Sequence, residues 1–210
     1  MRKVLYIFLA LATVLLAAYQ SLFPIPALTS TIRFLALEGF FLLCVSLIVG
    51  PLAVLNPEKF CALIKPRKAI GIASFAVVLA HFFLAFANFK ADPAVFFSSP
   101  SLSIAFFAFL ILVLIALTST QWALEKLGFF KWKTIQRLAY FVFALSLAHF
   151  LLSSNGLFVV FGSKVFVNAA EISMLALAGI TIALQVLGFL KTRSLKAKRA
   201  ETPEANCKTD

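Results

Sequence analysis

Six long apolar runs constrain this chain more than any other feature of its sequence. A helix needs roughly 20 apolar residues to cross about 30 Å of hydrocarbon, and each run is close to that length. The sequence therefore predicts an all-α fold, a polytopic membrane bundle of six transmembrane helices. Residues 1–190 would form one membrane domain, and residues 191–210 a basic cytoplasmic tail too short to fold alone. The runs are Val4–Phe23, Ile32–Leu55, Ile70–Phe89, Leu102–Thr118, Ile135–Ser153 and Val167–Leu190.

Composition agrees with a membrane protein and excludes other classes. Hydrophobic residues make up 62% of the chain and charged residues 13%, against about half and about a quarter in soluble domains. These values exclude an ordinary soluble globule and a disordered chain. The three cysteines, Cys44, Cys61 and Cys207, lie far apart, so neither a disulfide framework nor a thiolate metal site follows.

The positive charges gather on one side of the predicted membrane. Sixteen of the 19 Lys and Arg residues lie before the first run, in the second and fourth loops or in the tail. Because cytoplasmic segments carry the excess of Lys and Arg, both termini are predicted to lie in the cytoplasm of a multi-pass plasma-membrane protein. The net charge of +11 is then a topology signal. The expected partner of these basic residues is membrane lipid, and no nucleic-acid partner is expected. The remaining cations are Arg33, Lys90 and Lys164.

The first run has an alternative interpretation. Arg2-Lys3, an apolar stretch and Ala17-Ala18 also fit a cleaved signal peptide covering residues 1–18. Cleavage would leave five helices in the same orientation. The run is long for a signal peptide, which favours a retained helix.

The only two histidines, His81 and His149, both fall inside predicted spans. His81 follows Lys68 by 13 residues, and His149 follows Arg137 by 12. Both helices would start at the cytoplasmic side, which places both imidazoles roughly 18–20 Å from that edge. Two imidazoles at one depth on two helices can ligate one haem iron from its two faces.

Three other roles for these histidines stay open. Each can simply bond a neighbouring helix. A zinc site would need Cys44 and Glu38 to converge on them, because zinc takes about four ligands. A proton relay through His81, His149 and Glu38 is the third, because ionisable groups inside a membrane are usually functional.

Three pieces of sequence accompany the two histidines in order: Arg67-Lys68-Ala69-Ile70-Gly71 before the third helix, Leu117-Thr118-Ser119 at the end of the fourth, and Trp132-Lys133-Thr134-Ile135-Gln136-Arg137-Leu138-Ala139-Tyr140 at the start of the fifth. Together they resemble the ferric-reductase-like transmembrane domain superfamily, and within it the haem-binding membrane subunit of the bacterial periplasmic methionine sulfoxide reductase system. The resemblance covers about residues 31–190. It implies that His81 and His149 are the axial ligands of a haem b.

Two departures from the family pattern shape what the resemblance implies. Members with a second, cytoplasmic-side haem carry an additional histidine on the third and fifth helices, where this chain has Arg67 and Gln136. One haem per chain in the outer half of the membrane is therefore expected. The 20 residues after Leu190 are also too few for a Rossmann-type flavin or nicotinamide domain. Electrons would come from a separate donor, either a quinol or a flavin supplied from outside the chain.

Charged residues near the predicted outer side of the membrane are further candidates for functional roles. Glu38 would lie about 12 Å below the outer surface, where it is either a neutral or paired carboxyl or a group that exchanges protons with a quinol. Glu171 would lie at similar depth. Arg33 is a candidate partner for haem propionates, whereas Lys90 and Lys164 are expected to be interfacial anchors.

Two classes of function follow. The first is a b-type haem protein, an oxidoreductase or an electron-transfer subunit. It would relay single electrons towards an outer acceptor: a ferric chelate, oxygen or a partner protein. The second is a non-redox membrane protein, either a proton-coupled transporter or an accessory scaffold. The spans lack the paired broken helices typical of transporter sites, which favours the first class.

Overall fold

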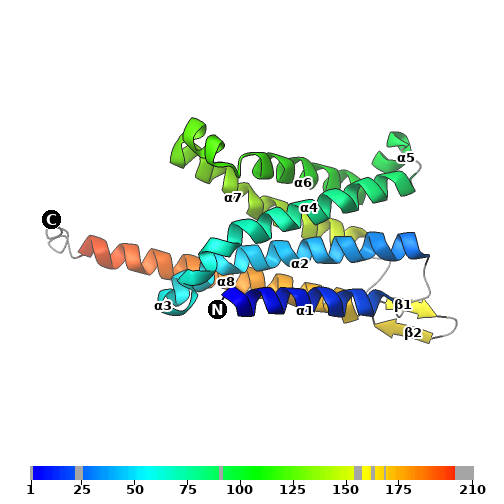
Figure 1. The fold of residues 1–210 in the computed structure, drawn as a ribbon, viewed down its shortest axis with the longest axis horizontal. Helices are drawn as coiled ribbons and strands as arrows, with labels where there is room; N and C mark the ends of the chain where they lie inside the picture. Colours follow the sequence, from blue (N-terminus) through cyan, green and yellow to red (C-terminus); the bar gives the residue numbers. More distant parts are fainter. Residues whose placement is uncertain are drawn as a thin grey trace.

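Long helices running along a common direction make up almost all of the structure, a computed structural model (Figure 1). It describes residues 2–21, 26–89, 92–153, 158–161, 164–167 and 169–201. In chain order the elements are α1 (Arg2–Ser21), α2 (Ala27–Leu55), α3 (Pro57–Phe60), the 3₁₀ turn η1 (Cys61–Leu63), α4 (Ile64–Asn88), α5 (Pro93–Phe97), α6 (Pro100–Leu117), α7 (Gln121–Ser153), β1 (Phe158–Phe161), β2 (Lys164–Val167) and α8 (Ala169–Glu201).

Five of these segments are long and apolar enough to cross a membrane: α2, α3 to α4 taken together, α6, α7 and α8. The remaining predicted span, the first run at Val4–Phe23, corresponds to α1. Its apolar stretch, Tyr6–Ala18, is shorter than a full span within the residues whose side chains the structure describes. The chain is therefore a multi-pass helical membrane protein.

Proline and short polar side chains set several helix starts. Pro57, Pro93 and Pro100 occupy first-turn positions of α3, α5 and α6, where a missing N–H costs nothing. Asn56 Oδ1 accepts a hydrogen bond from Lys59 N, and Asp92 Oδ1 accepts one from Ala94 N. These caps place the breaks between the spans.

Several details differ from the predicted layout, among them an earlier start of α2 and α4 and the short helices α3 and α5. Helix α8 continues to Glu201, so the first half of the expected tail is helical; its Lys, Arg, Leu and Ala residues are good helix formers. Helix α7 starts at Gln121 rather than near residue 135, and it breaks at Gly128 with φ 73°, a left-handed value that glycine adopts without strain. An antiparallel pair, β1 and β2, precedes α8 and was not predicted. Its Phe and Val residues favour strands.

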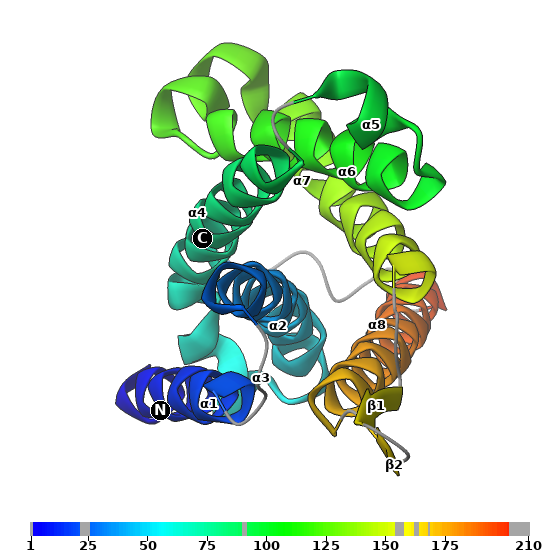
Figure 2. The same ribbon diagram turned by 90° about the vertical axis from the view of Figure 1, so that its right-hand side faces the viewer.

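Helix α2 lies at the centre of the bundle, with α1, α4 and α8 around it (Figure 2). Of its apolar stretch, 61% is buried, against 11–22% in the other four candidate spans. The core gathers around its middle turns, where Leu37, Phe41, Leu43 and Leu47 are all buried. The other helices leave many large apolar side chains exposed, as expected where lipid is the solvent.

The basic segments share one end of the bundle. The start of α1, α3, the start of α4, the start of α7 and the end of α8 lie together at the left of Figure 1, and α5 and the hairpin lie at the right. Arg33, near the start of α2, belongs to the opposite end. The charge asymmetry of the sequence is therefore an asymmetry of the folded bundle.

A proline inside α2 leaves a backbone carbonyl that α8 satisfies. Pro51 has no N–H, so Leu47 O lacks its helical donor four residues later. Gln185 Nε2 of α8 donates to this carbonyl over 2.8 Å, and Lys191 Nζ donates to Leu55 O over 2.6 Å. A Cβ on Gly188, between them, would lie 3.0 Å from Pro51 Cβ. The small size of Gly188 lets α8 approach α2 closely, and the two donors Gln185 and Lys191 hydrogen-bond the carbonyls of α2.

We expect Gln185→Leu to lower the free energy of unfolding by about 1–2 kcal/mol, because the buried Leu47 carbonyl would lose its donor. Reversible unfolding in mixed micelles would measure the change. Gln121→Leu is the matched control, because Gln121 is exposed at the start of α7; it should change stability by less than about 0.5 kcal/mol. Equal effects of the two substitutions would contradict the proposed role of Gln185.

Candidate functional site

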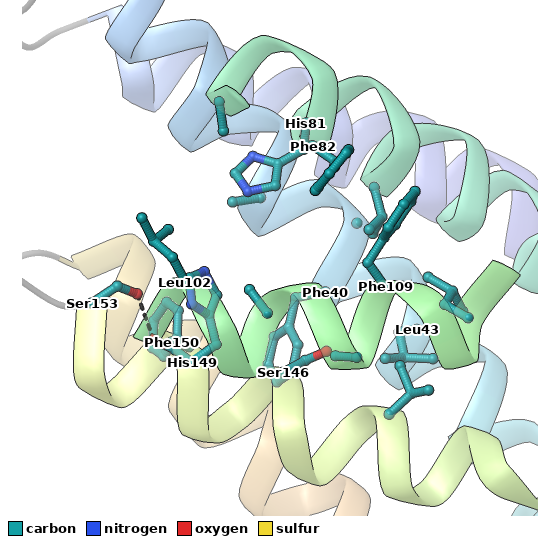
Figure 3. Close-up of a pocket in the computed structure, with 18 residues that line it drawn as sticks. Phe40, Leu43, His81, Phe82, Leu102, Phe109, Ser146, His149, Phe150 and Ser153 are labelled. Atoms are coloured by element: carbon teal, nitrogen blue, oxygen red, sulfur yellow. Dashed lines mark hydrogen bonds between the residues drawn. The ribbon is translucent and has the colours of Figure 1, made fainter. Parts of the chain in front are cut away.

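A pocket opens between α2, α4, α6 and α7, and both histidines line it (Figure 3). The space between its walls is about 940 Å³, open solvent at its mouth included. Small residues make the room: Ala36, Gly39, Ala85, Ala105 and Ala108. The lining is almost entirely apolar.

His81 and His149 face each other across this pocket (Figure 3). His81 comes from α4 and His149 from α7, and both helices run from the basic end to the opposite end (Figure 1). Both side chains are half-buried. The structure thus brings together the two residues that sequence analysis singled out.

Backbone carbonyls settle which ring nitrogen of each histidine carries the proton. His81 Nδ1 lies 3.0 Å from Ile32 O of α2, and His149 Nδ1 lies 2.9 Å from Ser101 O of α6. A carbonyl oxygen can only accept a hydrogen bond, so both Nδ1 atoms donate. Each neutral ring then keeps its lone pair on Nε2, the arrangement found in metal-ligating histidines.

Stacked aromatic rings form two walls of the pocket. Phe40 of α2 stacks on Phe143 and Phe150 of α7, with ring centroids 5.7 and 6.0 Å apart. Phe82 of α4 stacks on Phe109 of α6 with centroids 4.3 Å apart. Four of these rings line the pocket, and Phe143 supports Phe40 from behind without lining it. Their interlocking makes the walls stiff and water-excluding.

Close contact between α2 and α4 sets the width of the pocket. Ser74 Oγ, fully buried, donates to Gly39 O over 2.8 Å. A Cβ on Gly39 would lie 2.7 Å from Val78 Cγ2, closer than real side chains approach. Glycine at this position therefore lets α4 carry His81 to the edge of the pocket.

Glu38 lies behind the pocket wall, against α1, and does not line the pocket. It is 5% exposed, and its Oε1 lies 2.8 Å from Thr13 Oγ1, which also lies 2.9 Å from Leu9 O. One hydroxyl hydrogen cannot serve both acceptors fully. Both contacts are satisfied when Thr13 donates to Leu9 O and a protonated Glu38 donates to Thr13. Glu38 Oε2 has no hydrogen-bond partner among the described residues.

Arg33 does not line the pocket. Arg33 is exposed on α2, and its charge acts on Glu171 at the start of α8. It lies next to Ile32, the residue that bonds His81. Lys90 lies outside the described residues, as does the side chain of Lys164.

The zinc alternative finds no ligand set in the described part of the chain. No group of three or more His, Cys, Asp or Glu residues comes together there. Cys44 is fully buried on α2 and does not line the pocket. The two histidines therefore face the pocket without a third metal ligand of these types among the described residues.

Gln136 and Arg67 stand where family members with a second haem carry histidines, and in this structure both lie against neighbouring helices. Gln136 Nε2 lies 3.3 Å from Ile115 O and from Thr118 Oγ1, at the end of α6. Trp132 Nε1 donates to Thr118 O over 2.9 Å. Arg67 lies against α2, where a Cβ on Gly50 would be 3.3 Å from its Nη1. Two of the motif pieces noted in the sequence thus meet at the α6–α7 junction.

Comparison with known families agrees with this geometry. The profile of the ferric reductase-like transmembrane component matches residues 34–147, just over half of the chain. The chain belongs to this family. The matched segment runs from α2 into α7 and includes His81, and it ends at residue 147, two residues before His149. The family assignment and the pocket therefore concern the same helices.

Several named relatives share the same region. The chain is 31% identical over 123 residues to the protein-methionine-sulfoxide reductase heme-binding subunit MsrQ of Agrobacterium fabrum, covering 55% of this chain and 54% of that protein. It is 30% identical over 115 residues to MsrQ of Herminiimonas arsenicoxydans, with 52% of each chain covered. It is 34% identical over 128 residues to the magnetosome protein MamZ of Magnetospirillum gryphiswaldense, covering 59% of this chain and 19% of MamZ. The chain therefore spans about half the length of the MsrQ relatives it matches.

Sequence reasoning did not find the groups that orient the histidines. The Ile32 carbonyl is invisible in a residue pattern, because every residue has one. Ser101 is a serine in the first turn of a helix, an ordinary place for that residue type. Only the packing of α4 on α2 and of α7 on α6 identifies both.

We expect Gly39→Ala to destabilise the fold by about 1–3 kcal/mol, because the new methyl group would overpack against Val78. The double variant Gly39→Ala with Val78→Ala should recover most of that loss. Gly179→Ala is the control, because nothing lies within 4 Å of a Cβ there. Unfolding in micelles measures all three, and failure of the Val78 substitution to rescue would contradict the contact.

Proposed function

We propose that this protein holds one b-type haem between His81 and His149 and serves as the electron-transfer subunit of a membrane redox system. The facing pair of imidazoles carries the proposal. With both Nδ1 atoms committed to carbonyls, two Nε2 lone pairs are directed to one apolar pocket. Two neutral imidazoles are a standard axial ligand set for haem iron, so the residues present fit the group.

The chain's own residues would do three things at this site. His81 and His149 would hold the iron. The phenylalanine walls would exclude water and fix the plane of the group, and burial would tune its potential. When bound, the haem supplies one-electron redox chemistry. Arg33, at the outer end of α2, is the proposed partner for its carboxylates.

Partners of the redox system are inferred from the relatives. MsrQ is named as the heme-binding subunit of a protein-methionine-sulfoxide reductase. By analogy, we propose a separate acceptor protein on the outer side and a quinol or flavin donor supplied from outside this chain. Whether the subunit turns over a substrate itself would follow from those partners.

Glu38 is the proposed proton-exchange group. Its contacts with Thr13 are best satisfied by the protonated form, and a neutral carboxyl inside a membrane avoids the cost of a buried charge. It sits one residue before Gly39, which lines the pocket. A proton held here could accompany an electron held in the pocket.

The proposed topology has six spans, including α1, in the plasma membrane with both termini in the cytoplasm. The gathering of basic segments at one end of the bundle supports it through the positive-inside rule. The pocket histidines then lie in the outer half of the membrane.

Haem quantification tests the proposed ligands. The wild-type protein, made under haem-replete conditions, should carry about one haem per chain with a low-spin b-type spectrum after reduction. His81→Ala and His149→Ala should each lower haem content more than about tenfold, because one axial bond is lost. Gln136 stands where family members with a second haem carry a histidine. The Gln136→Ala variant should keep its single haem.

Size-exclusion chromatography of the haem-free variants distinguishes loss of haem from loss of the fold, because a folded variant elutes like the wild-type protein. A wild-type protein without haem would overturn the proposal. It would favour the alternative of a non-redox membrane protein, either an accessory scaffold or a proton-coupled transporter, with histidines that serve packing or proton relay.

Cysteine labelling tests the topology. Cys61 is exposed in η1 at the basic end, and Ala94 is exposed in α5 at the other end. In a Cys207→Ser background, a membrane-impermeant maleimide should label Ala94→Cys in intact cells and label Cys61 only after lysis. Labelling of Cys61 from outside would reverse the orientation.

A further inference from the structure

The hydroxyl of Ser101 is an unassigned feature of the pocket. Ser101 is 7% exposed, in the first turn of α6. Its Oγ lies 2.9 Å from His149 Nδ1 and 3.3 Å from His149 O, while its own carbonyl lies 2.9 Å from the same Nδ1. One residue thus contacts both the ring and the backbone of His149.

The proton positions in this contact are determined by chemistry. Nδ1 must donate, because the Ser101 carbonyl can only accept. Ser101 Oγ therefore accepts from the same N–H and keeps its own hydrogen for His149 O. The single N–H of Nδ1 is shared between the Ser101 carbonyl and hydroxyl oxygens, and the hydroxyl hydrogen goes to His149 O. Together these contacts restrain the imidazole in its plane as well as in its tautomer.

The two histidines differ in this respect. Among the residues that the structure describes, His81 Nδ1 has a single acceptor, Ile32 O at 3.0 Å, whereas His149 Nδ1 has two at 2.9 Å. Each acceptor that bonds the N–H of Nδ1 increases electron donation from Nε2, because it draws the Nδ1 proton away from the ring. His149 is therefore the more basic ligand of the pair.

We infer that Ser101 is a positioning residue for His149: its hydroxyl fixes the orientation of the imidazole and holds the reduction potential of the bound haem lower than the carbonyl alone would. The inference rests on the proposed function. It requires no change in which groups ligate the iron.

Three variants test the inference in the haem-loaded protein. Ser101→Ala removes the hydroxyl and keeps the carbonyl, and Ser101→Thr restores a hydroxyl. Ser153→Ala is the matched control, because Ser153 Oγ donates to the same His149 O over 2.5 Å without touching the ring. The readouts are haem per chain, the midpoint potential and the g-values of the oxidised haem, which report the ligand planes.

We expect Ser101→Ala to keep its haem and to favour the reduced form by roughly threefold, about 28 mV for a one-electron couple at 59 mV per tenfold. Its g-values should shift, and Ser101→Thr should return both readouts towards wild type. Haem loss from a monodisperse Ser101→Ala protein, with haem kept by the other two variants, also supports a positioning role.

Two results would overturn the inference. One is a haem-loaded Ser101→Ala protein with the potential and g-values of the wild type. The other is a Ser153→Ala protein with the same shift or the same haem loss, because the effect would then act through the backbone of His149. Either result leaves the proposed function intact, whereas a wild-type protein without haem overturns the proposed function itself.

Discussion

The carbonyl groups of α2 accept the side-chain hydrogen bonds that hold its neighbours in place. His81 and Ser74 of α4 donate to Ile32 O and Gly39 O, and Gln185 and Lys191 of α8 donate to Leu47 O and Leu55 O. Helices in lipid gain little from the hydrophobic effect between one another, so polar contacts and close packing must align them. Helix α2 packs between α4 and α8, and the rest of the bundle takes its position from these contacts.

The same device orients the pocket histidines. Each imidazole uses a carbonyl of an adjacent helix, His81 that of Ile32 and His149 that of Ser101. The ring orientation is therefore coupled to the helix packing rather than to a flexible side chain. A cofactor held between such rings would experience a preorganised site, which is the main contribution a protein makes to cofactor chemistry.

The two ends of the bundle use polar residues differently. At the basic end, Gln136 and Trp132 bond the end of α6, and the α6–α7 junction is closed by contacts within the protein. Towards the other end, the pocket is lined mainly by Ala, Gly, Val, Leu and Phe, with two imidazoles and two serine hydroxyls among them. This polarity matches a single cofactor site away from the basic end.

Apolar length, charge and rare residue types are properties of the chain. The residue pattern was therefore enough to predict the membrane class, five of the helical spans, the segregation of basic residues and the candidates His81 and His149. It did not predict the extension of α8, the break at Gly128 or the hairpin, where local preferences compete. Helix packing, in contrast, is what turns Glu38 towards α1 instead of the pocket and what brings Ile32 and Ser101 to the histidines. Those relations depend on which helices touch and at what register, and backbone carbonyls carry no sequence signature.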